Sequence, residues 1–295
     1  MATTTRPEGS TTTEAARTEA PPRADDGLIY GLTPPRARGG FLVRHPSVIR
    51  LASVLAVLVA WELYGRALNP VFLSYPVAIA GALVELIGSG ELLTATGQTL
   101  RSLVAGFGIA LIVGIGTGFL MGRYPLVSLT LDPFVTALYN TPSVALIPLI
   151  QLWFGLGVTA KVIIVGLSAF FPIVINTYAG VHNTSQGLVD VVRAYGATDR
   201  QISTKVVLPN SVPFIMAGVR LAVGRAVIGV VTAEFFTAIT GLGGLVIVFS
   251  NAFATAKLFV PVLTLVALGL TLTSLAKWAE RRLTPWKDSE RAATR

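Results

Sequence analysis

The chain has 295 residues, of which 53% are hydrophobic and 13% charged, and its formal net charge is +8. A soluble domain is about a quarter charged, so this composition excludes an ordinary soluble protein and indicates a membrane protein. With no cysteine and only two histidines, the chain lacks disulfides and thiolate metal sites, and it has too few imidazoles for a metal cluster. The basic excess comes without an aromatic and basic recognition module, which indicates membrane orientation rather than nucleic-acid binding.

The first segment, residues 1–40, differs in composition from the rest of the chain. It begins MATTTRPEGSTTTEAARTEAPPRADD and nearly lacks large apolar side chains. Such a segment buries too little surface to offset the entropy lost on ordering, so we predict a disordered tail. A membrane domain is expected over residues 41–286, followed by a short tail over residues 287–295.

Six later stretches are apolar and long enough to cross a bilayer, for which a helix needs about 20 residues. We therefore predict an all-α integral membrane fold with about six transmembrane helices. The loop after the first span contains YPVAIAGALVELIGSGELL, which predicts a short interfacial helix, with a further short span as the alternative. The predicted spans are Val48–Leu68, Thr99–Met121, Pro133–Phe154, Ala160–Ala179, Pro213–Ile239 and Leu258–Trp278.

Basic residues flank the predicted spans at both ends. Four arginines lie between positions 36 and 50, before the first span, and four Lys or Arg residues lie between positions 277 and 287, at the end of the last. Cytoplasmic loops carry an excess of Lys and Arg, so both termini are predicted to be cytoplasmic. With six spans, Arg123 and the segment between the fourth and fifth spans then face the same side.

Small residues recur at every fourth position of the second and fifth spans. Helices in membranes approach closely where such residues lie, because their association depends on close packing. We interpret the pattern as tight helix packing, with sliding interfaces as the alternative. The two stripes are Ala110, Gly114, Gly118 and Gly122, and Gly218, Ala222 and Ala226.

Polar and charged side chains within the predicted spans are costly in lipid and should face protein or water. Pro142 and Pro148 are predicted to kink the third span. Asn140 and Gln151 lie eleven positions apart, a spacing that returns to nearly the same face of a helix. Two hypotheses stay open for each such side chain: it lines or gates a path across the membrane, or it makes a structural contact between helices. The candidates are Asn140, Gln151, Asn176, Arg220, Arg225 and Glu234.

A charged segment, VVRAYGATDRQISTKVVLPN, separates the fourth and fifth spans. Apolar residues upstream of its glycine recur at i, i+3, i+4 and i+7, which predicts an amphipathic helix. Gly196 supplies a stop for that helix. The members of the predicted apolar face are Leu188, Val191, Val192 and Tyr195.

A second short helix is predicted after Gly196. The sequence TDRQ, residues 198–201, matches a capping box. Ile202 and Val206 would form the apolar side of this helix, which should end near Leu208 because a residue before proline avoids the helical region. The apolar faces of the two short helices are too small for the helices to be stable alone. The helices are therefore expected to pack either on the chain's own spans or on a soluble partner.

The charged segment resembles the signature loop of permease subunits of ATP-binding-cassette (ABC) importers. That pattern is Glu-Ala-Ala, three residues, Gly, nine residues, and Ile-x-Leu-Pro, and the spacing here matches throughout. The departures are Asp for Glu, two Val for two Ala, and Val for Ile. The matching positions are Asp190, Val191, Val192, Gly196, Val206, Leu208 and Pro209.

Further blocks extend this resemblance from about residue 50 to residue 286. LIPLIQLWFGLG, FFPIVINTYAGV, GVRLAVGRAVIGVVTAEF and TGLGGLV are similar to the nitrate, sulfonate and taurine branch of these permeases. The resemblance implies the type I importer (MetI-like) fold and a non-catalytic permease subunit. Residues 182–212 would be the cytoplasmic coupling loop. The residues expected to couple to an ATPase are Asp190, Val191, Val192, Arg193, Gly196, Ala197, Val206, Leu208 and Pro209.

The resemblance also implies partners and a class of solute. The chain lacks a Gly-x-x-x-x-Gly-Lys-Ser/Thr loop, so a separate ATPase would bind ATP and Mg, and this chain would bind no cofactor. The expected partners in the cell membrane are a second permease copy in a homodimer, a cytoplasmic ATPase dimer and an extracytoplasmic solute-binding protein. The expected solute is a small organic or inorganic anion of the sulfonate, taurine or nitrate type, with a pyrimidine vitamin precursor or an aromatic acid as the alternative.

Two other classes of function are weaker hypotheses. A secondary transporter would couple to ions through intramembrane carboxylates, for which Glu62 and Glu234 are the candidates. It would leave the charged segment unexplained. A membrane enzyme would need clustered acids, a nucleophile with its base, or a His-Glu-x-x-His motif, and the sequence shows none of these.

Overall fold

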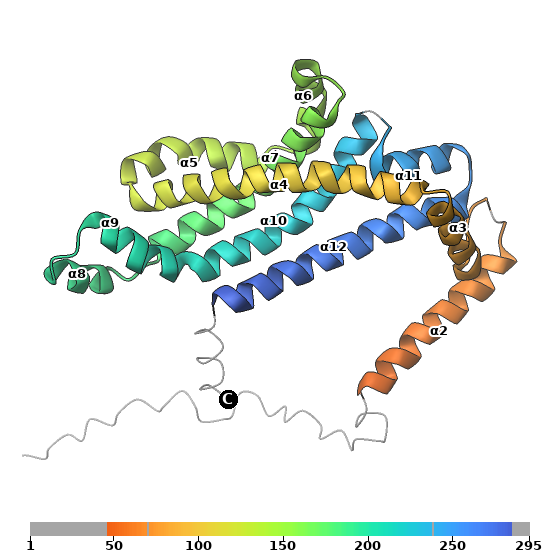
Figure 1. Cartoon of the computed structure of the whole chain (residues 1–295), viewed down its shortest axis with the longest axis horizontal. Helices are drawn as coiled ribbons and strands as arrows, with labels where there is room; N and C mark the ends of the chain where they lie inside the picture. Colours follow the sequence, from red (N-terminus) through yellow and green to blue (C-terminus); the bar gives the residue numbers. More distant parts are fainter. Residues whose placement is uncertain (1–45, 70, 238, 285–295) are drawn as a thin grey trace, which may run out of the picture. The chain divides into compact units, whose positions relative to one another are not determined.

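The computed structural model describes residues 46–69, 71–237 and 239–284, and within these ranges the secondary structure is helical, without strands. The predicted tails, residues 1–40 and 287–295, lie outside the described residues. The chain divides into two units, residues 1–56 and 57–295, and every contact described below lies within the second. In chain order (Figure 1) the elements are α2 (Pro46–Ala67), α3 (Pro76–Gly88), α4 (Glu91–Arg123), α5 (Pro125–Asn140), η1 (Ser143–Leu146), α6 (Ile147–Phe154), α7 (Val158–His182), α8 (Gln186–Ala194), α9 (Asp199–Ile202), η2 (Ser203–Val207), α10 (Leu208–Phe236), α11 (Gly241–Asn251) and α12 (Thr255–Leu283).

Within the described part of the chain, five helices are long and apolar enough to cross a membrane, and a bent pair, α5 with η1–α6, makes a sixth candidate. The predicted all-α fold with about six spans is therefore confirmed. The second span begins earlier than predicted, at Glu91 rather than Thr99. The predicted short helix after the first span is α3, whose 13 residues are too few to cross a bilayer.

The third span differs from the prediction of one kinked helix. α5 ends at Asn140, Thr141 is extended (φ −75°, ψ 128°), and the chain resumes in η1 and α6 after a bend of 95°. Thr141 precedes Pro142, and a residue before proline avoids the helical region. Pro148 lies in the first turn of α6, where the missing N–H of proline costs nothing. The predicted kink at Pro148 is therefore wrong, and Asn140 and Gln151 do not share a helical face.

α7 lies at the centre of the bundle, with α4 along one side and α10 along the other. A Cβ atom placed on Gly118 of α4 would lie 2.6 Å from the carbonyl oxygen of Val174, and one on Gly218 of α10 would lie 2.9 Å from that of Pro172. The backbones can approach this closely only because glycine has no side chain, so the predicted tight packing of both stripes is confirmed. The core between the three helices consists of Leu103, Ala110, Val165, Ala169, Ile173, Ala222, Ala226 and Val230.

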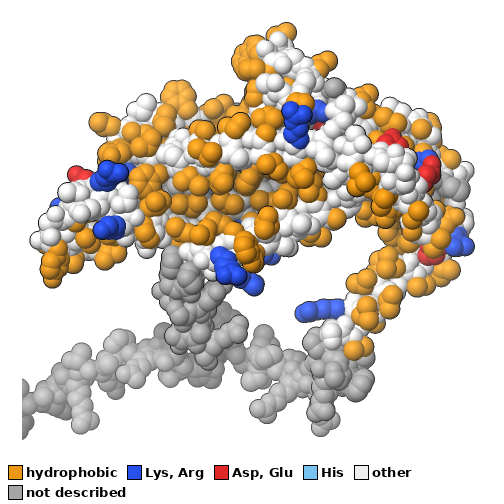
Figure 2. Space-filling model, viewed as in Figure 1, with side chains coloured by type: hydrophobic (Ala, Val, Ile, Leu, Met, Phe, Trp, Pro, Cys, Tyr) orange, Lys and Arg blue, Asp and Glu red, His pale blue; other side chains and the backbone are white. Residues whose placement is uncertain are grey.

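The bundle has two chemically different ends. α8 and α9 lie at one end, which we call the hairpin end, and α11 lies at the other. Figure 2 shows mainly hydrophobic side chains along the helices between them and Lys and Arg side chains over α8 and α9. Arg123, at the end of α4, lies 2.8 Å from Asp199 of α9, so the loop after the second span and the charged segment share one end, as predicted.

α11 lies between the last two spans and was not predicted. It has 11 residues, too few for a span, and it begins with GLGG. Glycine is a poor helix former, so local propensity does not indicate a helix there. Its first turn is held instead by side chains from other helices, as described below.

Candidate functional site

The charged segment forms two short helices around a glycine turn, as predicted. α8 ends at Ala194, and Gly196 adopts a left-handed conformation with φ +80°. The capping box is also confirmed. Thr198 donates its backbone N–H to Gln201 Oε1 at 2.8 Å, and the N–H of Gln201 donates to Thr198 Oγ1 at 3.4 Å. We call residues Gln186–Val207 the hairpin.

The second hairpin helix does not end before Pro209, contrary to the prediction. It continues through the π-helical segment η2 into α10, and Leu208 has helical angles (φ −61°, ψ −49°). The wider π turn makes room for the proline ring, which would clash with the preceding turn of a regular α-helix. Because a π turn adds one residue, Ile202 shares its buried face with Val207 rather than with the predicted Val206.

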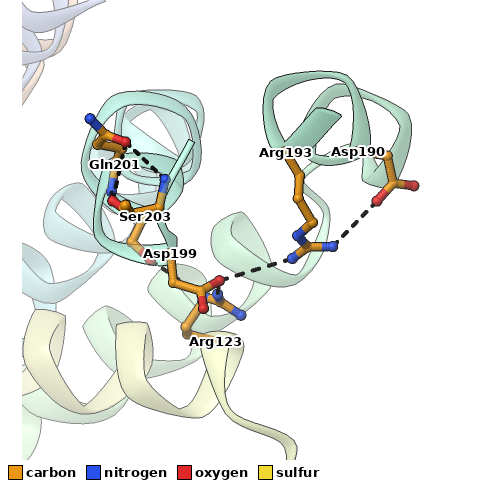
Figure 3. Close-up of polar contacts among 7 residues, drawn as sticks. Arg123, Asp190, Arg193, Asp199, Gln201 and Ser203 are labelled. Atoms are coloured by element: carbon orange, nitrogen blue, oxygen red, sulfur yellow. Dashed lines mark hydrogen bonds and ion pairs between the residues drawn. The ribbon is translucent and has the colours of Figure 1, made fainter. Parts of the chain in front are cut away.

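Ion pairs fix the hairpin to the bundle and α8 to α9 (Figure 3). Arg123 Nη2 lies 2.8 Å from Asp199 Oδ1, and Arg123 Nε donates to Ser203 Oγ at 3.2 Å. Arg193 lies between two carboxylates, 3.5 Å from Asp190 and 4.0 Å from Asp199. Exposed pairs are worth only about 0–1 kcal/mol each. These ion pairs and the buried apolar cluster beneath the hairpin together hold the hairpin in one orientation.

α8 turns an apolar stripe away from the bundle. Val189 is buried and Val192 is half-buried, whereas Leu188 and Val191 are exposed and Tyr195 is 88% exposed. Three of the four residues of the predicted apolar face thus find no cover among the described residues. Of the two alternatives for this face, the structure therefore favours contact with a partner.

The other predicted coupling residues lie at the base of the hairpin. Ala197 borders the buried cluster that contains Ile202, and Val206 is half-buried. Leu208 and Pro209 are exposed in the first turn of α10. The structure thus brings the predicted coupling residues to one end of the bundle.

A cavity of about 420 Å³ lies where the third span breaks. Asn140 and Arg225 line it, so the structure brings together two of the six pathway candidates. Irregular backbone at membrane depth is tolerated only where it is buried in protein or lines a water-filled space, which accounts for the break lying at a cavity. Lining residues that were not predicted include Tyr139, Ser143, Ser168, Phe171 and Thr232.

Three other pathway candidates lie away from the cavity lining and make contacts within or between helices. For these side chains the structural hypothesis has direct support, because each already holds a hydrogen-bond or ion-pair partner. Gln151 Nε2 donates to the carbonyl of Phe236, Asn176 Nδ2 donates to that of Pro172 at 2.8 Å, and Arg220 Nη1 lies 3.2 Å from Glu280 Oε2 of α12.

Glu234, the sixth candidate, lies in a buried polar cluster at the α11 end. Its carboxylate accepts hydrogen bonds from Thr99 Oγ1 and from the N–H of Gly243, both at 2.8 Å. Thr99 Oγ1 accepts in turn from the N–H of Leu242 at 2.8 Å. Lys161 of α7 adds a hydrogen bond at 2.6 Å to the threonine that precedes α11. Side chains of three spans thus hold the first turn of α11, whose N–H groups have no acceptor within the helix.

These features are those of a multi-pass membrane protein, with a helical bundle, a hairpin at one end and a cavity at a broken span. The chain belongs to the family described as the binding-protein-dependent transport system inner membrane component, which matches residues 106–285. It is therefore an ABC-importer permease subunit, as the sequence resemblance indicated.

Named relatives and solved structures agree with this membership. The chain is 32% identical to SsuC of Bacillus subtilis, a putative aliphatic sulfonates transport permease, over 79% of this chain and 86% of that protein. It is 33% identical to RibX of Chloroflexus aurantiacus, a riboflavin transport system permease, over 86% and 96% of the two chains. A chain of the MetNI methionine ABC transporter in an inward-facing conformation has a TM-score of 0.57 at 21% identity, covering 65% of this chain and 96% of that chain. The predicted MetI-like fold is confirmed.

Proposed function

We propose that this chain forms the transmembrane pathway for a small solute and couples its import to ATP hydrolysis by a separate ATPase. The observation that carries the proposal is the outward apolar stripe of α8 on a hairpin held to the bundle by Arg123 and Asp199. A hairpin attached to the bundle in this way can be held by a partner and can transmit the partner's movement to the spans.

The hairpin is continuous with the span that borders the cavity. Helical structure runs without a break from Asp199 to Phe236, through η2 and α10. Arg225 of this helix lines the cavity, and the same helix packs along α7. A displacement of α9 would therefore be carried along α10 to the cavity, which is the mechanical step that alternating access requires.

The proposed assembly contains two copies of this chain, an ATPase dimer at the hairpin end and a solute-binding protein at the α11 end. The hairpin end would face the cytoplasm together with both termini. The basic residues at that end, among them Arg123, Arg193 and Arg200, support this orientation. ATP and Mg would be bound by the ATPase, because this chain has no phosphate-binding loop.

The proposed solute is a small anion of the sulfonate, taurine or nitrate type. The identity with SsuC over most of both chains supports this class. A pyrimidine vitamin precursor or an aromatic acid is the second candidate, and the comparable identity with RibX supports import of a larger ring compound.

The contacts of the intramembrane carboxylates weigh against an ion-driven secondary transporter. Glu62 Oε1 lies 2.6 Å from Arg66, and its Oε2 accepts from the N–H of Val77 at 3.1 Å. Glu234 is enclosed by hydrogen-bond donors at the first turn of α11. Both carboxylates hold helices in place, so neither is disposed to load and release a coupling ion.

Replacing Tyr195 by Asp should abolish stable association with the ATPase. An exposed aromatic side chain at the centre of an interface commonly contributes 2 kcal/mol or more, so affinity should fall at least about 30-fold. The measurement is co-purification of the ATPase from membranes that contain equal amounts of each variant. Tyr195→Phe, which keeps the ring, should bind as the parent chain does. Unchanged association of the Asp variant would overturn the docking proposal.

Replacing Gly196 by Val should reduce ATP-dependent uptake without reducing the amount of chain in the membrane. Nothing lies within 4 Å of a Cβ placed there, so the substitution causes no clash, but the left-handed backbone disfavours other residues by about 1–2 kcal/mol. The population with the native hairpin turn should fall about 5- to 30-fold. Gly196→Asn should retain more uptake, because Asn tolerates this conformation. Normal uptake by the Val variant would contradict a coupling role for the turn.

A further inference from the structure

Arg225 lies deep within the membrane-crossing helix α10. It is 17 residues beyond Leu208, which places it about 26 Å along α10 from the hairpin end. At this depth within a membrane, a charged side chain must face protein or water. Among the described residues, Arg225 forms no hydrogen bond or ion pair, whereas Arg220 of the same helix pairs with Glu280 at 3.2 Å. Arg225 instead lines the cavity at the broken span.

The break in the third span lies at a similar depth. Asn140 is 15 residues beyond Pro125, or about 23 Å along α5 from the hairpin end. Its Nδ2 uses one hydrogen for the carbonyl of Thr136 at 2.8 Å and keeps a second to donate. Ser143, just after the break, adds a hydroxyl to the same cavity. Two independent features thus meet at one place: a broken helix, and a charge that has no hydrogen-bond or ion-pair partner among the described residues.

The rest of the cavity wall is mainly apolar. The rings of Tyr139 and Phe171 lie 6.3 Å apart on one side, and Ile164, Leu167 and Ile228 add aliphatic surface. No Asp or Glu is among the described residues that line the cavity. The cavity therefore presents a guanidinium and neutral donors beside an apolar surface, which suits an anionic group attached to a small apolar body.

We propose that this cavity is a binding site for a small organic monoanion, with a sulfonate or carboxylate head and an apolar body. Arg225 binds the head, because a guanidinium can donate two parallel hydrogen bonds to two oxygens of one anion. Asn140 and Ser143 orient the head, and the apolar wall holds the body. The volume of about 420 Å³ lies within the usual range for small-molecule sites. This inference rests on the proposed function and deepens it, because the permease itself would then select its solute.

The absence of cysteine from the sequence allows a test that requires neither ATP nor a known solute. Ser143→Cys introduces a single thiol into the cavity wall of the full chain, studied with its ATPase in membrane vesicles. Its rates of reaction are compared for two methanethiosulfonates of similar size, the anionic sulfonatoethyl and the cationic trimethylammonioethyl reagents. Adding Arg225→Gln should lower the anion-to-cation rate ratio at least about tenfold, because a nearby positive charge is lost.

Two controls separate charge from shape. Arg225→Lys keeps the positive charge and should keep most of the ratio. Arg220→Gln removes a charge from the same helix outside the cavity lining and should change the ratio less than about twofold, because the effect of a charge falls with distance. Excess ethanesulfonate should slow labelling of the introduced thiol when Arg225 is present and should not slow it in the Gln variant.

Each of three results would overturn the site. The introduced thiol could react with neither reagent, the anion-to-cation rate ratio could be equal with and without Arg225, or ethanesulfonate could fail to slow the labelling. Failure of the proposed function gives a different result. If the rate ratios follow expectation but the purified complex, supplied with its binding protein, shows no ATP-dependent uptake, the import proposal fails and the site stands. If uptake is normal but the two reagents react at rates that do not depend on Arg225, the site fails and the import proposal stands.

Discussion

Replacing Glu234 by Ala should lower the free energy of unfolding by about 3–5 kcal/mol, the range for removing one member of a buried charged network. Glu234 is fully buried, and its carboxylate accepts from Thr99 and from the N–H of Gly243. The substitution removes the acceptor for both donors, and each buried donor without a partner costs about 1–3 kcal/mol. The first turn of α11 would lose its hydrogen bond to α10, and the Thr99 hydroxyl of α4 would lose its acceptor.

The measurement is the unfolding midpoint of the purified chain in detergent, followed by tryptophan fluorescence. Glu85→Ala is the matched control, because Glu85 is exposed and pairs with Lys257 at 2.6 Å on the surface. Exposed pairs contribute about 0–1 kcal/mol, so this variant should unfold close to the parent midpoint. Similar midpoints for the two variants would contradict a structural role for the buried carboxylate.

Replacing Gly118 by Leu should separate α4 from α7 and destabilise the bundle by about 3 kcal/mol, at the upper end of the range for overpacked cores. A Cβ there would lie 2.6 Å from the carbonyl oxygen of Val174 and 2.7 Å from Cβ of Thr177. Neither atom belongs to the end of a flexible side chain, so the helices themselves must move. The expected result is a lower unfolding midpoint and a smaller yield of folded chain.

Gly116 provides the matched control in the same helix. It is exposed in the isolated chain, and nothing lies within 4 Å of a Cβ placed on it. Gly116→Leu changes helix propensity and side-chain volume as much as Gly118→Leu does, but it should leave the midpoint within about 1 kcal/mol of the parent value. Equal losses in both variants would show that helix propensity, rather than the α4–α7 contact, limits stability.

The hairpin shows how far local sequence signals extend. The turn at Gly196 and the capping box of Thr198 and Gln201 depend on neighbouring residues, and both were predicted correctly. The end of the second helix before Pro209 was predicted wrongly, because the rule for residues before proline assumes a regular α-helix and η2 is π-helical. Arg123 was not assigned to the site, since its partner Asp199 is 76 residues away.

The third span contained a signal that was underused. The sequence NTPS at residues 140–143 combines a turn-forming Asn with a residue before proline, which is typical of a helix end. It would have predicted the break between α5 and η1. No local pattern would have indicated Ser168, Phe171 or Thr232, which reach the cavity from α7 and α10.

By itself, the sequence determined the membrane class, the number and order of the spans, the small-residue stripes and the turn of the hairpin. Hydropathy, glycine spacing and capping act over a few residues, so they can be evaluated along the chain. Only the tertiary structure decided that Glu234 meets Thr99 across 135 residues, that α11 is a helix, and that Arg225 rather than Arg220 lies at a cavity. A polar group in a span must find a partner or water, and which of these it finds depends on how the helices pack.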